Sequence, residues 1–109
     1  LRSGVIERNS RRSGSLCDAI LTPQPGEITF PILKSLAGTG VVVTEDEALQ
    51  AMALAFSRLK IVAEPGGAVA LAATLFHGSE IEGDHVIATV SGGNVDAGVF
   101  RQALERFGG

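Results

Sequence analysis

The stretch that decides the predicted fold is His85-Val86-Ile87-Ala88-Thr89-Val90, which runs directly into Ser91-Gly92-Gly93-Asn94. A run of β-branched and apolar residues is typical of a buried strand. Two successive glycines indicate a turn at which the backbone approaches another group closely. The apolar residues after Asp96 predict a helix. A strand, a loop of small residues and a helix N-terminus in this order form a site that can bind an anion or the polar edge of a ring.

Apolar runs and helical patterns alternate along the rest of the chain. We predict strands over residues 16–21, 41–43 and 85–90, and helices over 30–36, 65–77 and 95–107, with a further helix that begins after Thr44. In that helix, Thr44 and Glu47 have the spacing of a capping box. Its apolar residues recur every three or four positions and are expected in the core; they are Leu49, Met52, Phe56 and Leu59. This order predicts an α/β fold, a parallel sheet flanked by helices.

Composition narrows the classes of protein to consider. The 109 residues suit one domain or part of one, and 45% hydrophobic with 19% charged residues predict a globular chain. The net charge of −3 and the scarcity of aromatic residues give no reason to expect nucleic acid as a partner. No apolar run approaches the length of a membrane span, so we expect no membrane partner. Cys17 is the only cysteine, which fits a cytoplasmic location.

The first fifteen residues differ from the rest. Residues 1–15 are polar, rich in Arg and Ser and without periodicity, so we predict a lead-in loop there and the C-terminal part of a catalytic domain over residues 16–109. The chain opens on Leu1, and we expect it to be a fragment of a longer protein.

Ser91 and Glu64 are the candidate site residues that the pattern itself provides. As a nucleophile, Ser91 would need a base, but a strand places His85 about 17–20 Å from it, and His77 falls at a helix end. A serine hydrolase is therefore disfavoured, and a hydroxyl that hydrogen-bonds a ligand is the better role. Glu64 precedes Pro65 at a predicted helix start, where it is either a helix cap or a site residue. No residues have the spacing of metal ligands, so we expect no metal.

Five motifs in order give the chain a family resemblance. They are Asp18-Ala19, Thr22-Pro23-Gln24-Pro25-Gly26 with Phe30-Pro31-Ile32, Thr44-Glu45-Asp46-Glu47, Ala63-Glu64-Pro65-Gly66-Gly67-Ala68-Val69-Ala70 and Ser91-Gly92-Gly93-Asn94-Val95-Asp96. This pattern resembles the C-terminal third of the serine/threonine dehydratases and serine racemases, which are pyridoxal-phosphate enzymes of the tryptophan-synthase-β fold type. The resemblance extends over about residues 15–107 and implies pyridoxal 5'-phosphate as the cofactor.

The resemblance also implies roles for six residues. Ser91 matches the serine that hydrogen-bonds the pyridine nitrogen of the cofactor, and a neutral hydroxyl there does not force that nitrogen to be protonated. Gly92 and Gly93 would let the backbone pack against the ring. Glu64 matches a glutamate near the ring and Ala19 a loop position beside the cofactor. Asn94 follows the motif and either contacts the cofactor or closes the turn.

Two parts of the family pattern are missing. The Schiff-base lysine of the family lies in a Ser-x-Lys motif, which surrounds neither Lys34 nor Lys60, and the tetraglycine phosphate loop is absent. We therefore expect no catalytic residue in this chain, and expect it to be inactive alone.

The function implied is that of a lyase of amino-acid metabolism. It would β-eliminate water from L-threonine or L-serine, a small-molecule substrate, to give a 2-oxo acid and ammonia. The expected partners are the remainder of the catalytic domain and, when complete, further copies in a homo-oligomer. Two alternatives stay open: a serine racemase-like enzyme, and a non-catalytic fragment that acts as a binding or interaction module.

Overall fold

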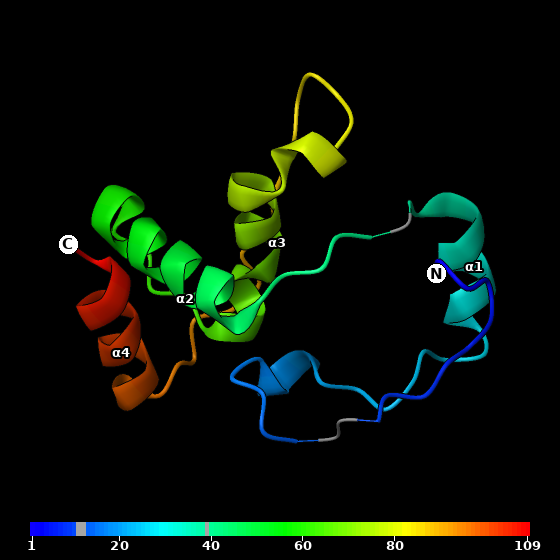
Figure 1. Ribbon diagram of the computed structural model, residues 1–109, viewed down its shortest axis with the longest axis horizontal. Helices are drawn as coiled ribbons and strands as arrows, with labels where there is room; N and C mark the ends of the chain where they lie inside the picture. Colours follow the sequence, from blue (N-terminus) through cyan, green and yellow to red (C-terminus); the bar gives the residue numbers. More distant parts are fainter. Residues whose placement is uncertain (11–12, 39) are drawn as a thin grey trace.

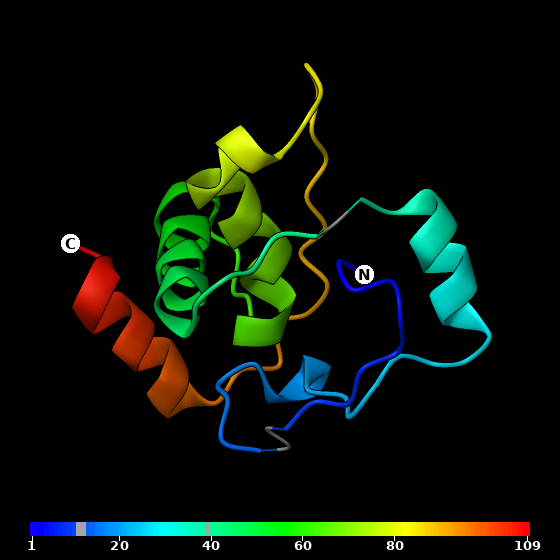
Figure 2. The ribbon, with the colours of Figure 1, turned by 45° about the vertical axis from the view of Figure 1, so that its right-hand side comes forward.

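Three helices pack around a small core on one side of the molecule. The computed structural model describes residues 1–10, 13–38 and 40–109. In it, α2 (Glu45–Leu54) lies against both α3 (Pro65–Phe76) and α4 (Ala97–Phe107), as Figures 1 and 2 show. α1 (Thr29–Leu36) lies apart from these three on the right-hand side of Figure 1, next to the N-terminal segment. Three short turns of helix, η1 (Asp18–Ile20), η2 (Ala55–Leu59) and η3 (Gly78–Glu80), complete the described elements.

The helix starts follow the capping signals of the sequence. The capping box is confirmed: Thr44 Oγ1 accepts from the Glu47 amide at 3.2 Å, and Glu47 Oε2 accepts from the Thr44 amide at 2.7 Å. α3 begins at Pro65, as predicted. α4 begins at Ala97, two residues later than predicted, because the Asp96 carboxylate accepts from the Gly98 amide at 2.8 Å and so acts as its N-cap.

The core consists mostly of alanines. Leu49 and Met52 are its largest fully buried side chains. The other members of the buried cluster are small, and they are Ala51, Ala63, Ala68, Ala72 and Ala103. Small side chains let helices approach closely, and they leave little apolar area to bury per residue. Phe56 of η2 and Phe100 of α4 close one side of this core in an edge-to-face contact, with ring centroids 5.3 Å apart.

One predicted core residue is on the surface. Met52 is fully buried and Phe56 is half-buried, but Leu59 is 62% exposed. The cause is that α2 does not continue regularly: residues 55–59 form a π-helical turn. A π turn has more residues per turn than an α-helix, so it rotates Leu59 away from the face that Leu49 and Met52 occupy.

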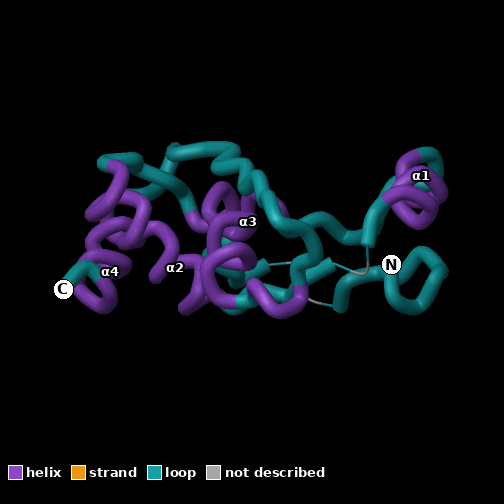
Figure 3. Tube along the Cα trace, turned by 90° about the horizontal axis from the view of Figure 1, so that it is seen from above, coloured by secondary structure: helices purple, strands orange, loops and turns teal. Residues whose placement is uncertain are grey.

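The predicted parallel sheet is not confirmed. No described residue is in a strand, and Figure 3 shows only helix and loop. Residues 16–21 contain η1 instead of a strand, and residues 41–43 and 85–90 are irregular. A parallel strand satisfies its backbone through neighbouring strands. Residues 85–90 make no backbone hydrogen bond to any other described residue, so the apolar pattern alone does not create a strand here.

The molecule is thin, and its larger apolar side chains are poorly covered. It measures 41 × 36 × 18 Å, and the radius of gyration of 14.8 Å exceeds the roughly 13 Å of a compact domain of this length. Ile87 is 96% exposed and Val42 is 74% exposed, both in segments predicted as buried strands. No helix in the described ranges is both long and apolar enough to cross a membrane.

The packing predicts a sharp difference between two apolar side chains. Met52→Ala is expected to lower the free energy of unfolding by about 2–5 kcal/mol, because it leaves a cavity in the alanine-rich core. Leu59→Ala is the matched control and should change it by less than about 0.5 kcal/mol, since Leu59 is exposed. Urea unfolding of both variants measures the difference. Equal losses would contradict this description of the core.

Candidate functional site

The loop at residues 91–94 crosses the first turn of α3. Two backbone hydrogen bonds hold the crossing, one donated from each side. The Glu64 amide donates to the Gly92 carbonyl at 3.0 Å, and the Ser91 amide donates to the Gly67 carbonyl at 3.4 Å. The loop then turns back on itself, where the Val95 amide donates to the Gly93 carbonyl at 2.9 Å. These bonds fix the backbone on both sides of Ser91 relative to α3.

Glycine is required at the crossing because the two backbones approach closely. A Cβ atom on Gly67 would lie 2.5 Å from the Gly92 carbonyl oxygen and 2.8 Å from the Gly92 nitrogen. A Cβ on Gly93 would collide with the carbonyl oxygen of Val62, and one on Gly92 with the carboxylate of Glu64. The sequence predicted that Gly92 and Gly93 allow a close approach. In the structure, the group that they approach is another part of the chain.

Glu64 is the N-cap residue of α3, but its side chain does not cap the helix. Its backbone carbonyl accepts the first helical hydrogen bond, from Ala68 at 3.0 Å, while its carboxylate makes no capping bond. The half-buried carboxylate instead lies against the Cα of Gly92. Of the two roles left open by the sequence, the side-chain cap is therefore not formed. The carboxylate remains available beside the loop that carries Ser91.

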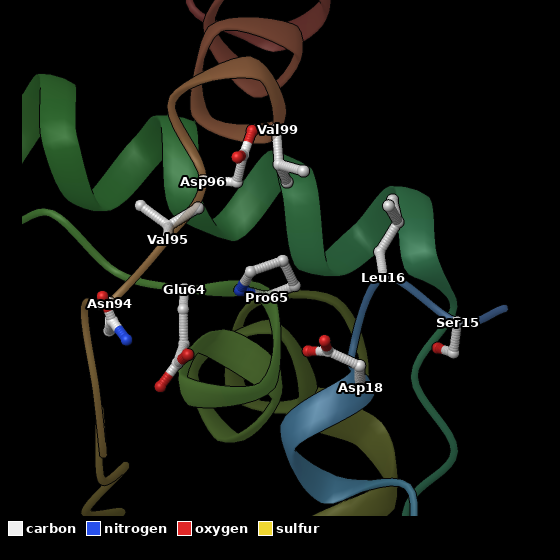
Figure 4. A pocket seen from close by; sticks show the side chains of 9 residues that line it. All are labelled: Ser15, Leu16, Asp18, Glu64, Pro65, Asn94, Val95, Asp96 and Val99. Atoms are coloured by element: carbon white, nitrogen blue, oxygen red, sulfur yellow. The ribbon is translucent and has the colours of Figure 1, made fainter. Parts of the chain in front are cut away.

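A hollow of about 270 Å³ opens next to the crossing. Its lining residues are Ser15, Leu16, Asp18, Glu64, Pro65, Asn94, Val95, Asp96 and Val99. Figure 4 shows Glu64 and Asn94 on one side of it and Asp18 on the other. Three of the lining side chains are carboxylates and none is cationic, so the hollow does not favour an anion. Within the described ranges, no group of three or more His, Cys, Asp or Glu residues could hold a metal ion.

The predicted site residues come together from three segments. Glu64 and Asn94 line the hollow, and Gly92 and Gly93 form the crossing beside it. Ala19 belongs to η1 and lies 3.6 Å from the position of a Cβ on Gly66, so η1 packs on the first turn of α3. Ser91 is exposed, and its hydroxyl makes no hydrogen bond to the described residues.

Sequence reasoning missed two contributors to this region. Gly67 is one of them. Its carbonyl accepts a hydrogen bond from the Ser91 amide, and because it has no side chain, the Gly92 backbone can lie close to it. Two Gly-Gly pairs, each after an apolar run, are the signal that could have linked them. The other is Asp96, which lines the hollow and caps α4. Cys17 lies near η1, but burial raises the pKa of its thiol, with the charge of Glu45 adding to this, so it stays protonated at neutral pH.

Comparison with known proteins assigns the chain to a family. A family model described as pyridoxal-phosphate dependent enzyme matches residues 3–92, which include η1, α1, α2, α3 and the first two residues of the loop that crosses α3. The chain belongs to the pyridoxal-phosphate dependent enzymes. The cofactor of this family is therefore pyridoxal phosphate, as the sequence motifs implied.

Three informative relatives within the family are identical to the chain at about a third or more of the aligned positions. An L-threonine ammonia-lyase of Thermotoga maritima is 33% identical over 106 residues, which are 97% of this chain and 26% of that protein. A serine racemase of Dictyostelium discoideum is 39% identical, over 88% of this chain and 30% of its own length. The catabolic L-threonine dehydratase TdcB of Escherichia coli strain K12 is 35% identical, over 86% and 29%.

A solved structure supports the same family. A crystal structure of a threonine deaminase from T.th. superposes with a TM-score of 0.79 at 38% identity, over 87% of this chain and 32% of that chain. The chain thus spans about a quarter to a third of the length of the relatives that it matches.

The crossing predicts opposite outcomes for two adjacent glycines. Gly67→Ala is expected to lower the free energy of unfolding by about 1–3 kcal/mol, because its methyl group meets the Gly92 backbone. Gly66→Ala is the matched control. Its nearest contact is the Cγ2 methyl group of Ile20 at 3.4 Å, an ordinary van der Waals distance, so little loss is expected. Urea unfolding measures both, and the Ser91 amide resonance should move in the first variant alone. Equal stabilities would contradict the crossing.

Proposed function

We propose that this chain forms one side of an active site, the side that contains Ser91. The enzyme is a pyridoxal-phosphate dependent lyase that dehydrates L-threonine or L-serine. The products are a 2-oxo acid and ammonia. The observation that carries the proposal is the Ser91 hydroxyl itself: its backbone is fixed by the crossing, while the hydroxyl is exposed and makes no hydrogen bond to the described residues. The names of the threonine ammonia-lyase and dehydratase relatives support the choice of reaction.

The residues at the crossing fit the nitrogen edge of a pyridine ring. A hydroxyl both donates and accepts, so Ser91 can bond a ring nitrogen without adding charge. A carboxylate in that position would favour protonation of the nitrogen, whereas a neutral hydroxyl does not. Gly92 and Gly93 keep the backbone beside Ser91 free of side chains. When bound, pyridoxal phosphate supplies the electron sink that lets an amino acid lose its α-proton and β-hydroxyl.

The same residues do not provide the phosphate site. A phosphate needs backbone amides or cationic side chains around it, and the hollow instead presents Asp18, Glu64 and Asp96. We therefore assign the binding of the cofactor phosphate to the remainder of the catalytic domain. Glu64 and Asn94 are assigned to the ring side of the cofactor, and Ala19 to the wall that η1 forms next to them.

Neither lysine of the chain is proposed to hold the cofactor covalently. Lys34 lies on α1, and its Nζ donates to the Gly4 carbonyl at 2.9 Å. Lys60 ends η2, and its Nζ donates to the Ser57 carbonyl at 2.9 Å. Both amines are thus bonded in places other than the crossing. On this basis the 109 residues alone are inactive, and a lysine from the rest of the enzyme completes the site.

The rest of the catalytic domain also accounts for the exposed apolar segments. We propose that residues 16–109 belong to that domain, with residues 1–15 as its lead-in loop, and that residues 41–43 and 85–90 become strands when they pair with it. The exposure of Val42 and Ile87 supports this, because strands of parallel sheets are apolar on both faces. The complete enzyme is proposed to be cytoplasmic and a homo-oligomer.

The test uses the longest polypeptide that the reading frame encodes, loaded with pyridoxal phosphate. We expect it to release a 2-oxo acid and ammonia in equal amounts from L-threonine or L-serine, and we expect the 109 residues alone to release none. Ser91→Ala should lower kcat about 10²-fold, the scale of losing one hydrogen bond to a reacting system, without a matching loss of stability.

Ser79→Ala is the control, because Ser79 is an exposed serine on η3. It should leave both kcat and the urea midpoint unchanged. Unchanged turnover in Ser91→Ala would contradict the assignment of Ser91. Formation of D-serine without 2-oxo acid would favour the racemase alternative. That alternative is supported by the relative from Dictyostelium discoideum, which is named a serine racemase.

A further inference from the structure

The end of α3 opposite the crossing carries a cluster of three titratable side chains. His77 is the C-cap residue of α3. Its Nδ1 lies 2.9 Å from Glu80 Oε1 of η3, and its Nε2 lies 3.0 Å from Glu47 Oε1 in the first turn of α2. The side chains of His77 and Glu47 are 23% and 25% exposed, so the bond between them is partly shielded from water. The ring of His77 therefore joins the end of α3 to both η3 and α2.

The hydrogen bonds determine the protonation state of the ring. A carboxylate accepts hydrogen bonds and donates none, and a neutral imidazole carries a single N–H. Because both nitrogens of His77 face carboxylate oxygens, both bonds form only when the ring is an imidazolium. Loss of one proton leaves a nitrogen lone pair facing a carboxylate, which breaks one of the two bonds.

The charges also suit the two helix ends that they join. The imidazolium lies at the C-terminus of α3, where the helix dipole favours a cation. Glu47 lies in the first turn of α2, where the dipole favours an anion, and its second oxygen completes the capping box with Thr44. The contact between α2 and α3 is the most extensive between any two described helices. His77 therefore bonds α3 to the residue that also caps α2.

We propose that His77 is a pH-sensitive latch that fixes the C-terminal end of α3 to the N-terminal end of α2 while its ring is protonated. Breaking the latch frees the end of α3 that lies about 15 Å from the crossing at Gly67, at the helical rise of about 1.5 Å per residue. This inference is independent of the proposed function, because it needs neither cofactor nor substrate.

The neighbouring charges decide the pH range of the latch. The elements packed on α3 bring Glu45, Asp46 and Glu47 from α2, Asp18 from η1 and Glu80 from η3. Asp46 is bonded to Arg106 of α4, at 2.8 Å, and Glu45 accepts from the Leu16 amide at 3.1 Å. The carboxylates within hydrogen-bonding distance of the His77 ring are thus Glu47 and Glu80.

The pKa shifts have the direction that the geometry requires. The hydrogen bond that His77 donates to Glu80 raises the pKa of His77 above its ordinary value, and the charge and hydrogen bond of Glu47 add to this despite some desolvation of the ring. The backbone and hydroxyl of Thr44, with a smaller part from His77, lower the pKa of Glu47. A raised histidine pKa stabilises the fold below the unfolded value of about 6.5, and this is lost as pH rises through the folded pKa. The Glu47 contribution is lost as pH falls through its own lowered pKa.

The first test is an NMR titration of His77 in the full 109-residue chain. Its ring resonance is assigned with His85→Gln, since the chain has two histidines. The midpoint for His77 should be higher in the folded chain than in the same chain unfolded in urea. Glu80→Gln and Glu47→Gln should each lower the folded midpoint. Glu82→Gln is the control for removing an exposed acid nearby, and it should leave the midpoint unchanged, because exposed charges are screened by salt.

The second test links that midpoint to stability. In the wild type, the unfolding equilibrium constant should rise as pH passes through the His77 transition, by ten raised to the difference between the folded and unfolded midpoints. In His77→Gln that rise should disappear. Equal midpoints in the folded and unfolded chain would overturn the latch, and so would an unchanged pH dependence in His77→Gln. If His77→Gln does not fold, the Glu80→Gln midpoint decides the question on its own.

Discussion

The close approach of the Gly92 backbone to the first turn of α3 is the constraint on which the candidate site depends. Two hydrogen bonds, from Glu64 to Gly92 and from Ser91 to Gly67, act over a separation that only glycine at Gly67 permits. Those bonds fix the backbone on both sides of Ser91 while leaving its hydroxyl exposed. The fixed backbone sets the position of the Ser91 Cα, and so limits the positions that its hydroxyl can reach to the few staggered rotamers of the side chain.

Both α2 and η1 pack on α3, the helix on which this crossing lies. α2 and α4 pack on α3 through a core of alanines, with Leu49 and Met52 as the large buried side chains. Val42 and Ile87 have no such cover, and the molecule is only 18 Å thick. The chain matches only a quarter to a third of each relative, and its residues 85–90 make no backbone hydrogen bond to the other described residues.

The local signals predicted the helices well, whereas the sheet that was predicted from the apolar runs is not confirmed. The capping box at Thr44 and Glu47 and the proline at Pro65 act within one turn, so the sequence contains everything that they need. Strand formation at residues 85–90 depends on neighbours that no local pattern specifies. The same limit applies to the site. Glu64 and Ser91 were identified from their motifs, whereas the contact of Gly67 with Gly92 and that of His77 with Glu47 join residues 25 and 30 positions apart.

The most direct measurement of the central claim is the set of nuclear Overhauser contacts between Gly67 and Gly92 in the full chain, together with the hydrogen-exchange rate of the Ser91 amide. We predict strong contacts between the protons of the two glycines and slowed exchange of the Ser91 amide, because that amide is bonded to the Gly67 carbonyl. Absent contacts and an amide that exchanges as fast as in an unfolded chain would contradict the crossing, and with it the placement of Ser91.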